Sequence, residues 1–161
     1  MQLLFVCLGN ICRSPLAEAI FKQQIVLKGL EEHFIADSCG TADYEVGDPP
    51  DPRTIRNAIQ NGVFIRHRAR QFELTDFERF DLILAMDSHN QSALLRLPGA
   101  GRFESKIRLM RTFDEVDTGK DVPDPYHWPE ADFQKVYIIL ERSVRGLIAH
   151  LEKLRLIDPG D

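Results

Sequence analysis

The sequence predicts an α/β fold, with a parallel four-stranded sheet and helices on both of its faces. Short apolar runs at residues 3–6, 33–39, 81–85 and 106–110 are typical of buried strands. Helical patterns with cap signals separate these runs. Strands that alternate with helices favour a parallel sheet, because each crossover between parallel strands is usually helical.

Two cap signals define the helices of the first half. Ser14 and Pro15 are typical of an N-cap and a first helical position, so we expect a helix from Pro15 to Lys28. Gly29 is a suitable residue to end it. The pair at residues 51–52, Asp-Pro, repeats the pattern and predicts a second helix, which ends at Gly62.

The second half continues the alternation. Residues 75–78, Thr-Asp-Phe-Glu, match a capping box and predict a short helix, and residues 87–88, Asp-Ser, predict the start of another. A long polar loop covers residues 111–129. The last helix carries one apolar stripe, predicted to face the sheet: Phe133, Tyr137, Leu140, Val144, Leu147, Leu151 and Leu154.

Composition bounds the class of protein. The chain has 161 residues, of which 43% are hydrophobic and 28% charged, so we expect a single domain over residues 1–161. Its formal net charge of −5 argues against nucleic-acid and anionic-membrane partners. No signal peptide or apolar run of about 20 residues is present, which predicts a cytoplasmic protein. We expect a monomer, and the three cysteines suit a reducing compartment.

The loop after the first strand combines several independent features. It links the strand end at Cys7 to the helix start near Ser14, and Gly9 and Asn10 are residues that readily adopt a positive φ. In a strand, tight loop and helix N-terminus, backbone N–H groups converge on an anion. With Cys7 and Arg13 inside it, this loop is predicted to make and break bonds at a phosphorus-like centre.

The residues of this loop suggest distinct chemical tasks. A helix N-terminus and Arg13 favour a thiolate at Cys7, the form in which cysteine is a nucleophile. The planar Arg13 side chain matches two phosphoryl oxygens. Ser14 either donates to the sulfur or only caps the helix, and Cys7 itself could instead be a small core residue.

Residues 6–15, Val-Cys-Leu-Gly-Asn-Ile-Cys-Arg-Ser-Pro, and residues 124–126, Asp-Pro-Tyr, resemble the motifs of the low-molecular-weight protein tyrosine phosphatases. Shorter similarities lie between them, notably at residues 44–47 and 67–71. The resemblance implies a phosphate-binding loop after the first strand and hydrolysis of phosphotyrosine in protein substrates. The reaction would pass through a cysteinyl-phosphate and need no metal or other cofactor.

The resemblance also assigns roles to individual residues. Cys7 would be the nucleophile, Arg13 would bind the phosphate and the transition state, and Asp124, one of four aspartates in its loop, would be the general acid and base. The remaining assignments are phosphate or substrate contacts by Leu8, Gly9, Asn10, Ile11, Cys12, Ser14, Tyr44 and Tyr126, with support from Ser38 and His67. A second rim aromatic, frequent in the family, is here His127.

Other functions share parts of this pattern. By resemblance, a protein-arginine phosphatase typically has Thr at the position where this chain has Ile11. An arsenate reductase needs further cysteines downstream, and no cysteine follows Cys39 in this sequence, which disfavours that function. A phosphocarrier would not need both Arg13 and Asp124, whereas a noncatalytic phosphate-binding module or redox switch would tolerate loss of Asp124. Zinc is not expected, because Cys7 and Cys12 lack the paired spacing of structural sites.

Cys12 has two possible roles. It lies five residues from Cys7 in one curled loop, so the two sulfurs could form a disulfide after oxidation of Cys7. It could equally fill space behind the loop. The family resemblance favours the protective disulfide.

Overall fold

A four-stranded parallel sheet forms the centre of the structure, a computed structural model that describes residues 1–157 and side chains through residue 154. The end of the predicted domain, residues 158–161, lies outside the described residues. The sheet order is β2-β1-β3-β4. The strands are β1 Gln2–Cys7, β2 Ile35–Gly40, β3 Leu82–Ala85 and β4 Ile107–Leu109.

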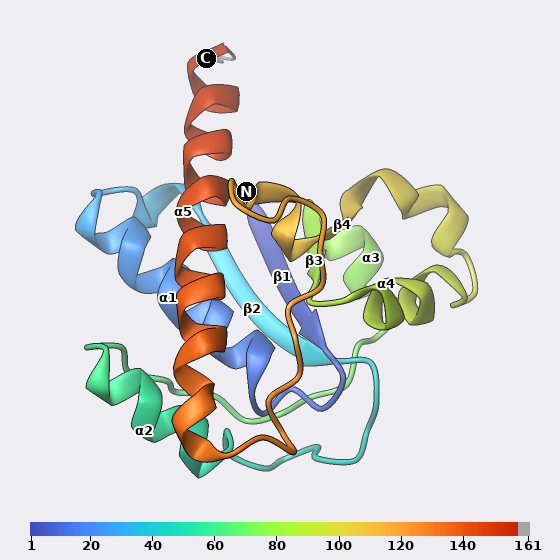
Figure 1. Cartoon of the computed structure of the whole chain (residues 1–161). Helices are drawn as coiled ribbons and strands as arrows, with labels where there is room; N and C mark the ends of the chain where they lie inside the picture. Colours follow the sequence, from blue (N-terminus) through green and yellow to red (C-terminus); the bar gives the residue numbers. More distant parts are fainter. Residues whose placement is uncertain (158–161) are drawn as a thin grey trace.

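Helices cover both faces of this sheet, which confirms the predicted fold class (Figure 1). The α-helices are α1 Arg13–Leu27, α2 Pro52–Gln60, α3 Asp76–Arg79, α4 Ser88–Leu95 and α5 Phe133–Ile157. Short 3₁₀ segments are η1 Glu31–His33, η2 Ala100–Lys106, η3 Met110–Phe113 and η4 Glu130–Asp132. Helices α1 and α5 pack together on one face, while α3 and α4 lie on the other.

The central strand β1 contributes to two separate cores. Leu3 and Phe5 pack with α1 and α5, whereas Leu4 and Val6 pack on the opposite face. All four side chains are fully buried. Burial on both faces explains why this strand is a continuous apolar run rather than an alternating one. It also fixes the end of β1, and with it the position of Cys7.

Residues 81–85 were predicted one residue too long, since β3 covers Leu82–Ala85. Two other strand predictions differ more. Residues 33–39 were expected to be extended, but Glu31–His33 form a 3₁₀ turn and the strand covers Ile35–Gly40. Residues 106–110 reduce to Ile107–Leu109, because the chain turns at Met110 into η3. Both errors lie at strand ends, where local hydrophobicity does not reveal where the neighbouring strand stops pairing.

The cap predictions were right at two helices and wrong at two. Asp51 accepts from the Arg53 N–H at 2.9 Å, and Asp87 caps α4 in the same way. Ser14 is not an N-cap, because α1 already begins at Arg13. Thr75 makes no side-chain cap hydrogen bond at α3.

The apolar stripe of α5 is confirmed except at its last member. Leu140, Val144 and Leu147 are fully buried, whereas Leu154 is 48% exposed. Figure 1 shows the reason: the C-terminal end of α5 extends beyond the sheet that the rest of the helix covers.

Helix α5 also contacts the segment before a long loop that we call the aspartate loop, residues 114–129. Gly146 packs so closely on η3 that a Cβ atom there would lie 1.9 Å from the Phe113 carbonyl oxygen. No side chain fits at this point, so backbone packs directly on backbone. The start of the aspartate loop therefore has a fixed position on α5.

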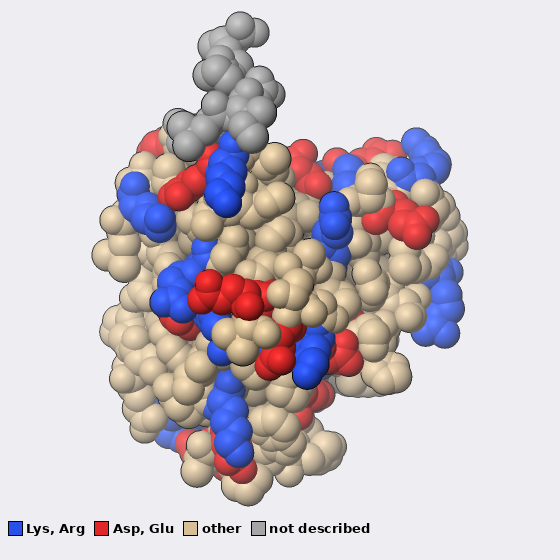
Figure 2. All heavy atoms as spheres, turned by 45° about the horizontal axis from the view of Figure 1, so that its top comes forward, with Lys and Arg blue, Asp and Glu red and all other residues tan. Residues whose placement is uncertain are grey.

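The surface shows mixed charge. On the face drawn in Figure 2, acidic and basic side chains are interspersed among the described residues rather than gathered by sign. None of the described helices is both long and apolar enough to cross a bilayer.

Candidate active site

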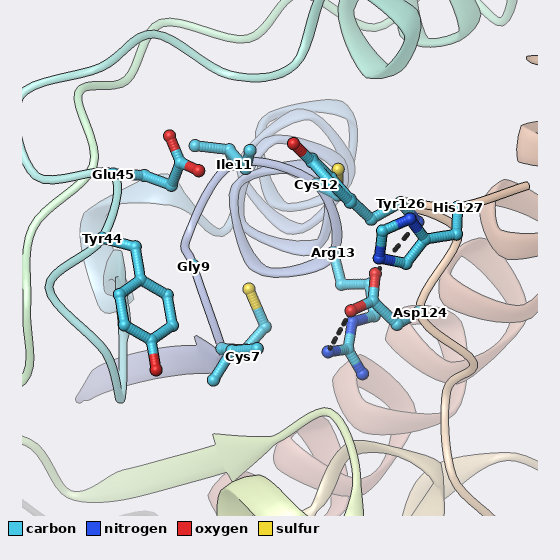
Figure 3. Close-up of a pocket in the computed structure, with 11 residues that line it drawn as sticks. Cys7, Gly9, Ile11, Cys12, Arg13, Tyr44, Glu45, Asp124, Tyr126 and His127 are labelled. Atoms are coloured by element: carbon cyan, nitrogen blue, oxygen red, sulfur yellow. Dashed lines mark hydrogen bonds and ion pairs between the residues drawn. The ribbon is translucent and has the colours of Figure 1, made fainter.

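A cavity of about 240 Å³ lies where β1 ends. Three segments that are distant in sequence build it: the loop after β1, the loop after β2, and the aspartate loop. Figure 3 shows Cys7 between Tyr44 on one side and Arg13 with Asp124 on the other. The lining residues are Cys7, Leu8, Gly9, Ile11, Cys12, Arg13, Tyr44, Glu45, Asp124, Tyr126 and His127.

The Cys7 sulfur receives polar contacts at the floor of this cavity. Its Sγ atom lies 3.0 Å from the Ser14 hydroxyl oxygen, and the Asn10 backbone N–H donates to it at 3.3 Å. Of the two roles that the sequence left open for Ser14, the structure therefore has the contact with the sulfur and not the helix cap. Both contacts suit a thiolate, which accepts hydrogen bonds from N–H and O–H groups.

The other two thiols have a different environment. Burial raises the pKa of Cys12 to about 12, although a hydrogen bond from Thr54 opposes the shift. Burial likewise raises the pKa of Cys39 well above its ordinary value. Cys12 and Cys39 therefore hold a proton at neutral pH, so neither competes with Cys7 as the thiolate that would attack a phosphate.

Asn10 determines the shape of the loop. Its φ is +59°, as predicted, whereas Gly9 does not adopt the positive φ expected of it. The Asn10 amide donates to the Ser14 hydroxyl at 2.8 Å and to the Ser38 hydroxyl at 3.0 Å. Its carbonyl oxygen lies 2.6 Å from His67 Nε2. Asn10, Ser14, Ser38 and His67 therefore come together behind the loop, outside the cavity lining.

A cluster of possible metal ligands adjoins this network. Carboxylate or imidazole atoms of Glu18, Asp37 and His67 lie within 4.8 Å of one another. Their charges are already compensated, because Glu18 pairs with Lys22 at 2.5 Å and Asp37 with Arg70 at 3.0 Å. His67 Nδ1 lies 3.5 Å from Glu18. The cluster thus forms part of the support for the loop.

Arg13 is a buried cation with several acceptors. Its Nη1 donates to Asp87 at 2.7 Å and to the Val122 carbonyl at 3.0 Å, and its Nη2 lies 3.6 Å from Asp124. Burial alone would lower the pKa of Arg13, but the charges of Cys7, Asp87 and Asp124 raise it above its usual value. The guanidinium therefore remains charged beside the sulfur.

Asp87 is a site residue that the sequence identified only as a helix cap. It follows β3, the strand that pairs with β1 in parallel, with Ala85 opposite Val6. The carboxyl ends of adjacent parallel strands meet at one sheet edge, which places Asp87 beside Arg13. Recognising this requires knowing that β3 is next to β1, and the sequence pattern does not give the strand order.

The four aspartates of the aspartate loop have separate environments. Asp124 lines the cavity and accepts from the Tyr126 N–H at 3.1 Å. Asp121 accepts from the Ser88 N–H at 2.9 Å. Asp114 and Asp117 both pair with Arg111. The structure thus distinguishes four residues that local sequence did not.

The outer walls are aromatic and partly polar. Tyr44 is 75% exposed and Tyr126 44%, and Figure 3 shows them on opposite sides of the Cys7 sulfur. Glu45 and His127 also line the rim, although the sequence assigned no role to Glu45. A hydrogen bond with Asp48 raises the pKa of Glu45.

Arg53 links the two sides of the site and was not predicted. Its Nη2 donates to the Tyr126 carbonyl at 2.9 Å and to Asp51 at 2.7 Å. The Asp51 N–H in turn donates to the Ile11 carbonyl at 2.8 Å. The start of α2 therefore contacts both the loop after β1 and the wall that carries Tyr126.

Known proteins resemble the whole chain. The sequence model of the family described as low molecular weight phosphotyrosine protein phosphatase matches residues 2–156. A phosphatase of that name from Schizosaccharomyces pombe is 43% identical, over 87% of this chain and 90% of its own length.

Solved structures extend the comparison. A protein tyrosine phosphatase from Entamoeba histolytica has a TM-score of 0.90 and 41% identity, covering 96% of this chain and 99% of its own. A Drosophila arginine phosphatase has a TM-score of 0.84 and 31% identity, with coverage of 94% and 98%. The match over almost all of the described residues shows that this chain is a hydrolase that belongs to the low molecular weight phosphotyrosine protein phosphatase family.

Proposed function

We propose that the protein hydrolyses phosphotyrosine in protein substrates through a covalent phosphate on Cys7. One observation carries the proposal: the Cys7 sulfur lies on the cavity floor, with Arg13 and Asp124 beside it. These three side chains would supply the nucleophile, the positive charge and the proton. The proposed chemistry therefore needs no metal ion or other cofactor.

The first step would be attack of the Cys7 thiolate on phosphorus. Hydrogen bonds from Ser14 and Asn10 support the anionic sulfur, and neither partner is itself charged. As the tyrosine oxygen departs, charge spreads over the three equatorial phosphoryl oxygens. The planar guanidinium of Arg13 can bind two of them, which a lysine ammonium could not do in the same geometry.

Asp124 would act in both halves of the reaction. Protonated, it would give its proton to the departing tyrosine oxygen. Ionised, it would then accept a proton from the water that attacks the phosphocysteine, releasing phosphate and the free thiolate. Its place on the cavity lining and its contact with Arg13 support this role over Asp114, Asp117 and Asp121.

The walls would select the substrate. Tyr44, Tyr126 and Leu8 border the opening and could enclose an aromatic ring. A phosphoserine side chain would be too short to carry its phosphate past these walls to Cys7. The longer side chain of phosphotyrosine would reach Cys7, and its ring would pack on the aromatic walls.

We further propose a single-domain, cytoplasmic, monomeric enzyme with phosphotyrosine proteins as its partners. The contact of α5 with both α1 and η3 supports the single domain, since it joins the two halves of the chain. The formal net charge of −5 supports the absence of nucleic-acid partners, and the face drawn in Figure 2 has no concentration of basic side chains.

The variant Asp124→Asn should test the proton transfer. It should lower kcat by ~10²–10⁴ for phosphotyrosine, and much less for aryl phosphates with good leaving groups, because their oxygen departs without a proton. Steady-state rates across a series of leaving groups measure this. Asp121→Asn, in the same loop, is the control. An equal loss for all leaving groups, or a larger loss from Asp121→Asn, would reassign the role.

Phosphoarginine is the second candidate substrate, because two structural neighbours are arginine phosphatases. Ile11 lines the cavity of this chain. Its apolar side chain offers no hydrogen-bond acceptor to a guanidinium, whereas a hydroxyl at the same place would. Ile11 therefore supports the preference for phosphotyrosine.

Replacing Ile11 by Thr should raise phosphoarginine turnover relative to phosphotyrosine turnover. Ile11→Val is the matched control, since valine has the shape of threonine without the hydroxyl, and it should leave the ratio unchanged. Competition between the two phosphopeptides gives the ratio of kcat/KM values directly. If the unmodified protein already prefers phosphoarginine, the arginine-phosphatase function replaces the one proposed here.

We also propose that Cys12 protects Cys7 from irreversible oxidation. Both thiols line the same cavity. Peroxide would oxidise the Cys7 thiolate to a sulfenic acid and leave hydroxide. The Cys12 thiol would then attack the Cys7 sulfur, forming a disulfide and releasing water.

Peroxide should therefore inactivate the wild-type enzyme reversibly, with activity restored by dithiothreitol and with bound phosphate slowing the loss. In Cys12→Ser the same treatment should continue to sulfinic or sulfonic acid at Cys7. Mass spectrometry of the oxidised protein identifies the product, with Cys39→Ala as control. A bridge between Cys7 and Cys39, or no bridge, would refute the protective role.

A further inference from the structure

Asp114 is a fully buried carboxylate with an unusually complete set of donors. Its side-chain oxygens accept from Arg111 Nε at 2.9 Å, from Arg142 at 2.5 and 2.8 Å, and from the Val116 N–H at 3.0 Å. The hydrogen bonds with Arg142 and Arg111 hold the pKa of Asp114 far below its usual range. This ion cluster lies at the start of the aspartate loop, where η3 packs on Gly146 of α5.

The two arginines of the cluster differ in what else they contact. Both hydrogen bonds of Arg142 go to Asp114. Arg111, by contrast, reaches further along the loop, because its Nη1 donates to the Asp121 carbonyl at 3.0 Å and its Nη2 lies 3.1 Å from Asp117. The Arg111 carbonyl also accepts from the Gly119 N–H at 2.8 Å.

The residue after Asp121 contacts the candidate active site. Val122 is fully buried, and its N–H donates to the Met86 carbonyl at 2.8 Å. Its own carbonyl accepts from Arg13 Nη1 at 3.0 Å. Asp124, two residues later, lies 3.6 Å from Arg13 Nη2.

We propose that Arg111 is a positioning residue for Arg13 and Asp124, acting through the backbone of residues 121–122. It holds the Asp121 carbonyl, and the adjoining Val122 carbonyl then meets the Arg13 guanidinium at the correct place. Without Arg111, the segment loses its hydrogen bond at the Asp121 carbonyl. The contacts with Met86 and Ser88 and the burial of Val122 remain, but they leave its carbonyl free to shift relative to Arg13. The expected effect on catalysis rests on the proposed function. The expected effect on oxyanion binding by Arg13 is independent of it.

A pair of matched variants tests this role. Arg111→Met and Arg142→Met each remove one cation from Asp114, so both should lower thermal stability. Only Arg111→Met should weaken binding of inorganic phosphate, measured by calorimetry, and by about tenfold. A remote mutation that misplaces a functional group by about 1 Å can lower a reaction rate by ~10²-fold. We expect a smaller effect on phosphate affinity, because the remaining contacts of Val122 limit the shift.

Activity gives the second measurement. Arg111→Met should lower kcat/KM for phosphotyrosine, with the greatest loss for poor leaving groups, because Asp124 shifts with the same segment. Arg111→Lys keeps the charge but not the planar fork, so it should show the same defect in milder form. If Arg111→Met does not fold, Arg111→Lys takes its place in the comparison with Arg142→Met.

The outcomes separate the two proposals. Equal phosphate affinities in the Arg111 and Arg142 variants would overturn the positioning role, whatever their stabilities. A wild-type protein that binds phosphate but does not hydrolyse phosphotyrosine would instead contradict the proposed function, while the difference in phosphate affinity would still stand.

Discussion

The buried guanidinium of Arg13 is the charge around which the site is arranged. An isolated cation at this depth would be costly, because burial removes its hydration. The start of α4 supplies Asp87, and the aspartate loop supplies the Val122 carbonyl and Asp124. Cys7 lies close enough to add to the charge balance. The same cation that needs these partners is the group suited to bind an oxyanion. Structural compensation and anion binding therefore depend on one side chain.

The parallel sheet makes this convergence possible. Because β1 pairs with β2 and β3 in the same direction, the segments that follow these strands meet at one edge. The loop after β1 carries Cys7 and Arg13, and Asp87 follows β3. Gly40, at the end of β2, has no room for a side chain, since a Cβ atom would lie 2.5 Å from the Leu8 carbonyl oxygen. The close packing of these backbones leaves the loop little freedom, and Asn10 uses its whole amide to hold it.

Local sequence predicted the strand, loop and helix around Cys7, because the features that form them are contiguous. It also predicted Asn10 in a positive φ and the caps at Asp51 and Asp87. For Ser14 it left two roles open, and the structure has the contact with the Cys7 sulfur rather than the helix cap. Asp87, Arg53 and Arg111 could not be recognised as site or support residues. Their relevance depends on strand order and on contacts between segments that lie far apart in sequence.

The account depends most directly on a covalent phosphate at Cys7. Rapid-quench experiments with an aryl phosphate that carries a radioactive phosphorus atom, followed by peptide mapping, would detect that species. The account predicts transient label on the peptide that contains Cys7, formed as fast as the phenol is released, and no label in Cys7→Ala. Turnover without a labelled peptide, or label on another residue such as His127, would contradict it.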